Sequence, residues 1–474
     1  MPNFFIKSSF LILTIIISLS IFLRVYYSYY LDSWFDEWNM LYTVDPNVSN
    51  EETWKRFFGD RGDSFLPEYY PPLNAFTLKY FLNFTGYNVE NARIYSLIFG
   101  SLSTILVYIL SVSISNSKNN FLATFLFSIN LFLIWQSSEI RPHSFVVFFS
   151  LLNIILFIQL INKRLSIFFI SLYILTSVLM LSSWPFTLCI YFGKTIYIFI
   201  HRNIKKIPML KFFLIFLTIL IFYIFLNYEY LIYHLQRNYH YTSLKLTFFV
   251  NYHFRSFFGS IILGAVFLIL FAFLFIKYIK KNFYDMDDSN VLFYIIISSY
   301  FLTTFYSIVK AGVISPKYLI FVLPLLIVWI CHKIKNLKLN LIITLLLIFF
   351  SIVNTSYFLF KNPIDRPPFK KLIEIIAKSN TLNVVTNHSI VFNNAFKINR
   401  AFIENELVLI DIKTETLDKK KFWFVCLNNA RFQVGNAILP IIEQCKILNN
   451  NKEFTEIKNI EIDDFILKKF IKNE

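Results

Sequence analysis

Long apolar runs follow one another along the first 360 residues of the chain. A helix of about 20 apolar residues is long enough to cross the ~30 Å hydrocarbon core of a membrane. On this criterion the sequence predicts about eleven spans, near residues 8–30, 93–114, 120–138, 142–161, 165–183, 185–200, 211–228, 257–276, 291–309, 318–331 and 339–360. The pattern is typical of a mainly α-helical, polytopic membrane bundle.

Positive charges gather in alternate connections between these spans. Because Lys and Arg are retained on the cytoplasmic side of a membrane, this asymmetry predicts a cytoplasmic amino terminus. An odd number of spans then places the carboxyl-terminal region outside. The cations that favour this orientation are Lys118, Lys163, Arg164, Arg202, Lys205, Lys206, Lys211, Lys277, Lys280, Lys281, Lys333, Lys335 and Lys338.

The composition excludes two other classes of protein. Hydrophobic residues make up 56% of the 474 residues and charged residues only 16%, with 58 phenylalanines. A soluble protein has too little interior to bury that much apolar surface, and a disordered chain needs the opposite balance. The net charge of +16 is explained by the cytoplasmic loops, so we do not expect a nucleic-acid partner.

Two large segments are expected outside the membrane. The first outer loop, 31–92, alternates aromatic with acidic residues and suits short helices at the membrane surface. We therefore expect a membrane domain at 1–360 that includes this loop, and a small extracytoplasmic α/β domain at 361–474. The elements predicted in that domain are a helix that follows Pro367 and Pro368 and continues through Lys378, a helix at Ala437–Leu448, strands at Leu382–Thr386 and Phe422–Leu427, and one or two further strands at Ile457–Leu467.

The four cysteines divide between these two regions. Cys189 and Cys331 fall in apolar spans, where a free thiol behaves as a small apolar side chain. Cys426 and Cys445 fall in the outer domain, where a disulfide could persist. The sequence leaves that bridge open, and it shows no Cys and His spacing typical of zinc.

Asp36 and Glu37 follow the first span within a few residues, in a segment rich in aromatic side chains. A carboxylate that is partly removed from water becomes more basic, and it can then accept a proton from an incoming hydroxyl. The alternative is an ordinary solvated acidic pair at the beginning of a helix. We treat Asp36 and Glu37 as candidate catalytic residues.

Three further motifs fall on the predicted outer side. Glu68 and Tyr70 precede Pro71 and Pro72, whose fixed φ suits the first turn of a helix. Glu139, Arg141 and His143 lie between the third and fourth spans, and the planar guanidinium of Arg141 suits a phosphate. Lys317 and Tyr318 begin the tenth span. The structural alternatives are a rigid turn, a Glu139–Arg141 pair and an interfacial anchor, respectively. The candidate residues of these motifs are Glu68, Tyr70, Glu139, Arg141, His143, Lys317 and Tyr318.

Other polar residues carry weaker signals. Lys194 lies within a predicted span, where a charged side chain is costly unless it has a function or reaches the interface. The outer loop at 229–256 contains His240, His253 and Arg255, which could contact phosphate or metal.

Taken together, these motifs resemble the GT-C-type polytopic glycosyltransferases, close to the bacterial protein-mannosyltransferase-like and aminoarabinose-transferase-like families. The resemblance lies in the order and shared side of the motifs, and it covers the membrane portion to about residue 360. Where relatives often have His or a Glu-Lys pair before the two prolines, this chain has Tyr69 and Tyr70. The matching segments are Trp34–Glu37, Pro71–Leu73, Arg93, Glu139–His143 and Lys317–Tyr318.

The resemblance implies a bacterial cytoplasmic-membrane enzyme that uses a polyprenyl-phosphate sugar donor at the outer face. Asp36 would act as general base in an inverting displacement, and the donor phosphate would be held by cations. The residues assigned to phosphate or lipid are Arg93, Arg141, Arg255, Lys317 and Tyr318, and those assigned to substrate positioning are Glu68, Tyr70, Glu139 and His143. No cofactor is required, and a divalent metal has no support in the sequence.

Several alternatives remain at this stage. The sugar (hexose or pentose) and the acceptor (protein, glycolipid or polysaccharide) are not identified. A lipid-linked polysaccharide polymerase or ligase would use the same substrates. A transporter or flippase is disfavoured because the chain has only nine glycines and no evident internal repeat. A non-enzymatic anchor leaves the acidic outer loop unexplained. The enzyme reading depends on one spatial expectation, that Asp36, Arg141 and Lys317 converge on one pocket.

Overall fold

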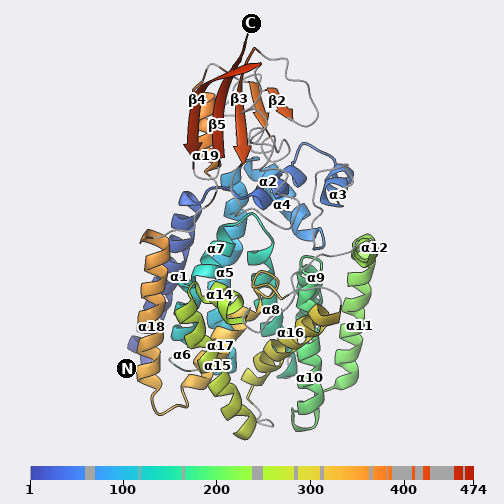
Figure 1. The fold of residues 1–474 in the computed structure, drawn as a ribbon. Coiled ribbons are helices and arrows are strands. Elements are labelled where there is room, and N and C mark those ends of the chain that lie inside the picture. The colour runs from blue at the N-terminus through green and yellow to red at the C-terminus, as the bar shows by residue number, and fades with distance from the viewer. Residues whose placement is uncertain are drawn as a thin grey trace. The chain divides into compact units, whose positions relative to one another are not determined.

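The computed structural model divides the chain into two compact units (Figure 1). The helical unit comprises Met1–Tyr29, Glu68–Leu78 and Arg93–Ile364, and the sheet unit comprises Tyr30–Pro67, Lys79–Ala92 and Asp365–Glu474. The residues described within them are 2–58, 70–115, 117, 119–162, 166–205, 207–236, 249–281, 287–309, 314–361, 366, 368–379, 381, 383–386, 408–411, 420–427, 453–462 and 465–473.

Among the described residues, seven helices are long and apolar enough to cross a membrane, or eight if one bent pair forms a single span. This confirms a multi-pass helical bundle, whereas the number eleven stays a prediction. The long helices are α1 (Pro2–Tyr30), α5 (Val89–Ile114), α8 (His143–Ile161), α11 (Met209–Leu226), α15 (Ile261–Lys281), α16 (Ser289–Val309) and α18 (Asn340–Ser356), which π-helix η3 (Tyr357–Lys361) extends.

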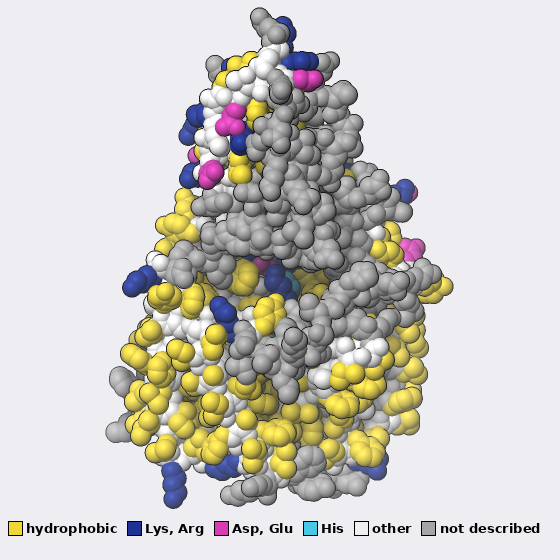
Figure 2. Space-filling model, viewed as in Figure 1, with side chains coloured by type: hydrophobic (Ala, Val, Ile, Leu, Met, Phe, Trp, Pro, Cys, Tyr) yellow, Lys and Arg dark blue, Asp and Glu magenta, His cyan; other side chains and the backbone are white. Residues whose placement is uncertain are grey.

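Apolar side chains cover most of the face of the helical unit that Figure 2 shows. Ile167 is 84% exposed, Phe225 79% and Ile308 75%. Such exposure is unfavourable in water but suits contact with lipid. The surface therefore agrees with the membrane location that the sequence predicts.

Other helices, most of them shorter, complete the helical unit. The predicted separation near Pro185 is present, because α9 ends at Leu181 and a 3₁₀ turn begins at Pro185, where a residue without a backbone N–H is tolerated. The remaining elements are α4 (Leu73–Thr85), α6 (Asn119–Ser128), α7 (Leu131–Ser138), α9 (Ile167–Leu181), η1 (Pro185–Thr187), α10 (Leu188–Lys205), α12 (Tyr228–Gln236), η2 (Phe249–Phe254), α14 (Arg255–Phe258) and α17 (Val322–Ile334). Of these, α4 continues into the sheet unit.

The span predicted at 120–138 is bent by 51° between α6 and α7. The break follows from Asn130, whose side chain accepts the N–H of Leu133 (3.0 Å) and so caps α7. The carbonyls freed at the break are also satisfied, since Arg24 donates to Ser128 O (3.1 Å) and Thr355 to Ile129 O (2.7 Å). Irregular backbone at membrane depth is tolerated only when such partners exist.

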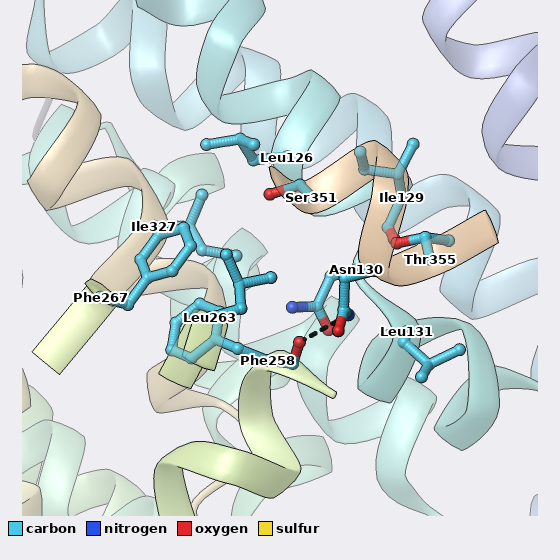
Figure 3. Close-up of a pocket in the computed structure, with 11 residues that line it drawn as sticks. Leu126, Ile129, Asn130, Leu131, Phe258, Leu263, Phe267, Ile327, Ser351 and Thr355 are labelled. Carbon is cyan, nitrogen blue, oxygen red and sulfur yellow. Dashed lines mark hydrogen bonds between the residues drawn. The ribbon is translucent and has the colours of Figure 1, made fainter. Parts of the chain in front are cut away.

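Figure 3 shows the small cavity at this break, which is lined by residues of α6, α7, α14, α15, α17 and α18. The amide of Asn130 donates to Phe257 O (2.9 Å), and the amide of Asn354 donates to Phe258 O (2.9 Å), the bond drawn in the figure. Both carbonyls lie at the end of α14, just before Gly259, whose φ of 84° ends the helix in the left-handed region. Side chains thus hold α7 and α14 at a fixed angle.

We expect Thr355→Val to destabilise the fold by about 1–2 kcal/mol, because it removes the donor to Ile129 O and leaves a buried carbonyl unsatisfied. Thr14→Val is the matched control, since the exposed Thr14 hydroxyl bonds only within its own helix. The midpoint of thermal unfolding of the purified protein measures the difference. Equal midpoints for the two variants would contradict the role given to Thr355.

The sheet unit contains a five-stranded mixed sheet of order β2-β1-β3-β5-β4. β1 pairs in parallel with β2 and β3, whereas β5 pairs antiparallel with β3 and β4. Phe422, Phe424 and Phe470 form part of its core, and helix α19 packs Phe369 against Phe465 of β5 (ring centroids 5.0 Å apart). The elements are α19 (Phe369–Ala377), β1 (Asn383–Thr386), β2 (Val408–Asp411), β3 (Lys421–Leu427), β4 (Phe454–Ile462) and β5 (Phe465–Lys472).

The α/β character predicted for the carboxyl-terminal region is confirmed, although β2 was not predicted. The helix expected at Ala437–Leu448 and Cys445 lie outside the described residues. Cys426 is disulfide-bonded, and Cys189 and Cys331 are free and buried. The boundary expected at residue 360 stays a prediction.

The first outer loop forms helices α2 (Phe35–Thr43) and α3 (Asn50–Phe58) within the sheet unit. The Tyr87 hydroxyl donates to Leu41 O (2.7 Å), and Lys79 donates to Val48 O (2.7 Å) and Thr53 Oγ1 (2.8 Å). Burial lowers the pKa of Lys79. These bonds make the loop a packed structure.

Candidate functional site

Asp36 lies in the first turn of α2, where a helix amino terminus stabilises negative charge. The backbone before it is extended, and Glu37 accepts the N–H of Trp34 (2.9 Å), as the glutamate of a capping box does. Asp36 is partly buried, whereas Glu37 is fully buried. The sequence Trp34–Glu37 therefore fixes Asp36 at the beginning of a short, well-capped helix.

The polar residues of the predicted outer motifs meet around Glu139 in the helical unit. Glu139 ends α7, is 2% exposed, and has Oε2 3.6 Å from Lys317 Nζ and 3.7 Å from His143 Nδ1. The ammonium of Lys317 also lies 5.5 Å from the centre of the Trp135 ring. Buried carboxylates need such a partner, so Glu139 holds Lys317 in a fixed place. The structure pairs Glu139 with Lys317, and the Glu139–Arg141 pair, our structural alternative, stays a prediction.

Aromatic rings surround this pair. The guanidinium of Arg141 lies 5.4 Å from the centre of the Tyr70 ring, and Tyr70 packs against Trp184 (5.3 Å). Trp184 also contacts His143 (5.4 Å), and it donates from Nε1 to the backbone carbonyl of Tyr318 (2.9 Å). The structure thus brings together Tyr70, Glu139, Arg141, His143, Lys317 and Tyr318, all of which the sequence singled out.

An apolar cavity of about 670 Å³ lies beside this cluster, within the helical unit. It is lined by residues of α9, η1, α10, α11 and α16 and by Tyr318, whose ring stacks on Phe186 at 4.9 Å. Because Lys317 precedes Tyr318, one end of an apolar groove adjoins a cation. That arrangement suits an amphiphile with an acidic head and a hydrocarbon tail.

Other predicted residues have different surroundings. Arg93 is buried and donates to Ser28 O (3.0 Å) near the end of α1. Arg255 is exposed at the beginning of α14, and Lys194 is fully buried, where it donates to Asn153 and to the Tyr173 hydroxyl (3.2 Å). Lys194 therefore does not extend to the interface. Glu68 and His240 lie outside the described residues. That Asp36 converges with Arg141 and Lys317 stays a prediction.

Two arginines with structural importance were missed. Arg366 pairs with Glu37 in the sheet unit, and Arg24 satisfies the break between α6 and α7. Arg24 could have been found from the sequence, since it is a charged residue inside the first apolar run. No sequence pattern marks Arg366, because only its tertiary contact shows its role.

The described residues include no group of three His, Cys, Asp or Glu side chains placed to hold a metal ion. In the cluster around Glu139, the side chain that lies beside Glu139 and His143 is Lys317, a cation. These residues do not fit a metal, so no step is assigned to one.

Comparison with solved structures identifies the fold. ArnT from Cupriavidus metallidurans in the apo state matches with a TM-score of 0.61 over 98% of this chain and 98% of that one, at 9% sequence identity. The chain has the fold of ArnT, a GT-C aminoarabinose transferase. ArnT bound to undecaprenyl phosphate matches with a TM-score of 0.59 and 10% identity over the same shares of both chains.

A second solved structure with a weaker match is the Archaeoglobus fulgidus oligosaccharyltransferase tethered with an acceptor peptide. The TM-score is 0.49 at 11% identity, over 82% of this chain, which spans only 63% of the oligosaccharyltransferase. No protein-family model matches the sequence, and a search of curated proteins finds no match. The ArnT likeness therefore establishes the fold, and the chemistry must be argued from the site.

Proposed function

We propose that this protein is a glycosyltransferase that moves a sugar from a polyprenyl-phosphate donor to a hydroxyl or amine at the outer face of the bacterial cytoplasmic membrane. The observation that carries the proposal is the 670 Å³ apolar groove that adjoins Lys317 through Tyr318. A polyprenyl chain would occupy the groove, and its phosphate would contact Lys317. The ArnT fold supports this assignment, since ArnT was solved with undecaprenyl phosphate.

In the proposed reaction, the acceptor oxygen or nitrogen attacks the anomeric carbon of the sugar. Asp36 accepts the proton of the acceptor, and the bond between the anomeric carbon and the phosphate oxygen breaks, so the lipid phosphate leaves with the electron pair. A single displacement inverts the anomeric configuration, as in the inverting glycosidases. Lys317 and Arg141 would stabilise the charge that develops on the phosphate.

The carboxylates have separate roles in this scheme. Glu139 orients Lys317, and Glu37 caps α2, so Asp36 is the residue to which we assign the proton transfer. Phosphate is already a competent leaving group, and the scheme needs no metal. The proposal requires Asp36 to converge with Arg141 and Lys317 on one site on the outer side, with the amino terminus in the cytoplasm.

The purified protein in lipid nanodiscs, incubated with labelled polyprenyl-phosphate hexoses and pentoses and with membrane extracts, tests the proposal. We expect label to pass to an acceptor one sugar at a time, with release of polyprenyl phosphate. Transfer of many sugars to one acceptor would indicate the polymerase alternative. Movement of intact donor across the membrane without transfer would indicate a flippase.

Filling the groove should weaken donor binding specifically. Cys189 is a small, buried residue of the groove lining, so we expect Cys189→Trp to raise the KM for the polyprenyl donor about tenfold while kcat changes little. Leu226→Trp is the matched control, because Leu226 is 51% exposed on α11 and is absent from the lining. Steady-state kinetics at varied donor concentration provide the measurement. An unchanged KM in the Cys189 variant would place the lipid elsewhere.

A further inference from the structure

A buried ion pair joins two segments of the sheet unit that lie far apart in the sequence. Arg366 Nη1 donates to Glu37 Oε2 at 2.5 Å, and the two side chains are 3% and 1% exposed. The same Nη1 donates to Asp32 O (3.1 Å). Arg366 therefore holds both the segment before α2 and a residue of its first turn.

Further contacts hold the same two segments together. The backbone N–H of Lys370 donates to Asp32 Oδ2 (3.2 Å), while Asp32 Oδ1 accepts the N–H of Ser33 (2.8 Å). The rings of Trp38 and Phe369 pack edge to face with centroids 5.7 Å apart. Residues 32–38 are thus fixed against residues 366–370 by a set of contacts that we name the α2 clamp.

The chemistry of this clamp explains why it should be rigid. Glu37 uses one oxygen for both Arg366 and the N–H of Trp34. When one partner of a buried ion pair is lost, an uncompensated charge remains in the interior, which is strongly unfavourable. Any movement of the first turn of α2 away from Arg366 therefore separates a buried pair.

Asp36 precedes Glu37 on that first turn, and neighbouring residues of a helix face different directions. The side chains of Glu37 and Asp36 therefore leave the same turn in different directions, and the clamp fixes that turn through Glu37. We propose that Arg366 is a positioning residue, which acts through Glu37 to fix the carboxylate of Asp36 for proton transfer. This inference rests on the proposed function, and it assigns a catalytic consequence to residues 366–370 of the sheet unit.

The kinetic test compares Arg366→Met, Glu37→Gln and the double variant with Lys371→Met, an exposed cation of α19 outside the clamp. A displacement of about 1 Å in a catalytic group can cost about 100-fold in rate. We expect each clamp variant to lower kcat by about 30- to 100-fold while the donor KM stays within about twofold. Because both residues act as one unit, the double variant should lose no more than either single variant.

Arg366→Lys provides a graded readout. A lysine keeps the charge but lacks the planar guanidinium that contacts both Glu37 and Asp32 O. We expect it to recover part of the lost kcat. A purely structural role would instead reduce the amount of folded enzyme, with an unchanged kcat per folded molecule, and that result would overturn the proposal.

Amide hydrogen exchange separates failure of this inference from failure of the proposed function, because it needs no substrate. We expect exchange at residues 34–38 to be at least about tenfold faster in Arg366→Met than in Lys371→Met. Unchanged exchange would overturn the clamp. If wild-type protein transferred no sugar from any donor while exchange increased as expected, the clamp would stand and the glycosyltransferase assignment would fail.

Discussion

Asp36→Asn should lower kcat for sugar transfer about a thousandfold. The substitution keeps the size and polarity of the side chain but removes its capacity to accept a proton, and a positioned general base contributes about 10²- to 10⁴-fold to a rate. Because Glu37 and Arg366 are unchanged, the first turn of α2 should remain in place. The thermal midpoint and the donor KM should therefore stay near the wild-type values while kcat falls.

Asp45→Asn is the control for this variant. Asp45 also belongs to the sheet unit, but its carboxylate accepts from Asn47 N and Nδ2 within its own turn. We expect its kcat to remain within about twofold of wild type. Full transfer by the Asp36 variant, measured with saturating labelled donor, would remove Asp36 from the mechanism.

Lys317→Ala should lower kcat/KM for the polyprenyl donor about 100-fold or more. The loss has two sources. The donor phosphate loses a cation, and the buried carboxylate of Glu139 loses the ammonium that compensated its charge and then repels the phosphate. The double variant Lys317→Met with Glu139→Gln has no carboxylate at position 139, so we expect it to regain part of the lost kcat/KM.

Lys361→Ala is the matched control, since Lys361 is an exposed cation at the end of η3. Its effect on kcat/KM should be small, because an exposed charge is screened by salt. A Lys317 variant with wild-type dependence on donor concentration would mean that the phosphate is bound elsewhere, although the apolar groove could still hold the lipid tail.

The sequence was most informative where a pattern repeats. Apolar runs of about 20 residues predicted the long helices, and short apolar runs predicted β1 and β3, because burial of such residues depends mainly on local spacing. Short motifs also singled out several of the residues that meet around Glu139, although Lys317, with which Glu139 pairs, lies far along the chain. Which cation pairs with a given carboxylate depends on tertiary packing.

The features that the sequence did not reveal depend on single side chains. Asn130 lies within an apolar run, and an average over about 20 residues conceals the bend that it makes. In the sequence Arg366 is indistinguishable from an ordinary basic residue beside Pro367, and only the structure shows its contact with Glu37. Strand β2 is only four residues long and pairs in parallel with β1, so it lacks the tight turn that marks an antiparallel hairpin in a sequence.

The break between α6 and α7 has a consequence for biogenesis. Its carbonyls are satisfied by Arg24 of α1 and by Thr355 of α18, which lie far apart in the sequence. The ribosome synthesises Arg24 well before Thr355, so α6 and α7 must enter the bilayer before both partners are available. The final angle between them, and with it the placement of Glu139, can be reached only after α18 has joined the bundle.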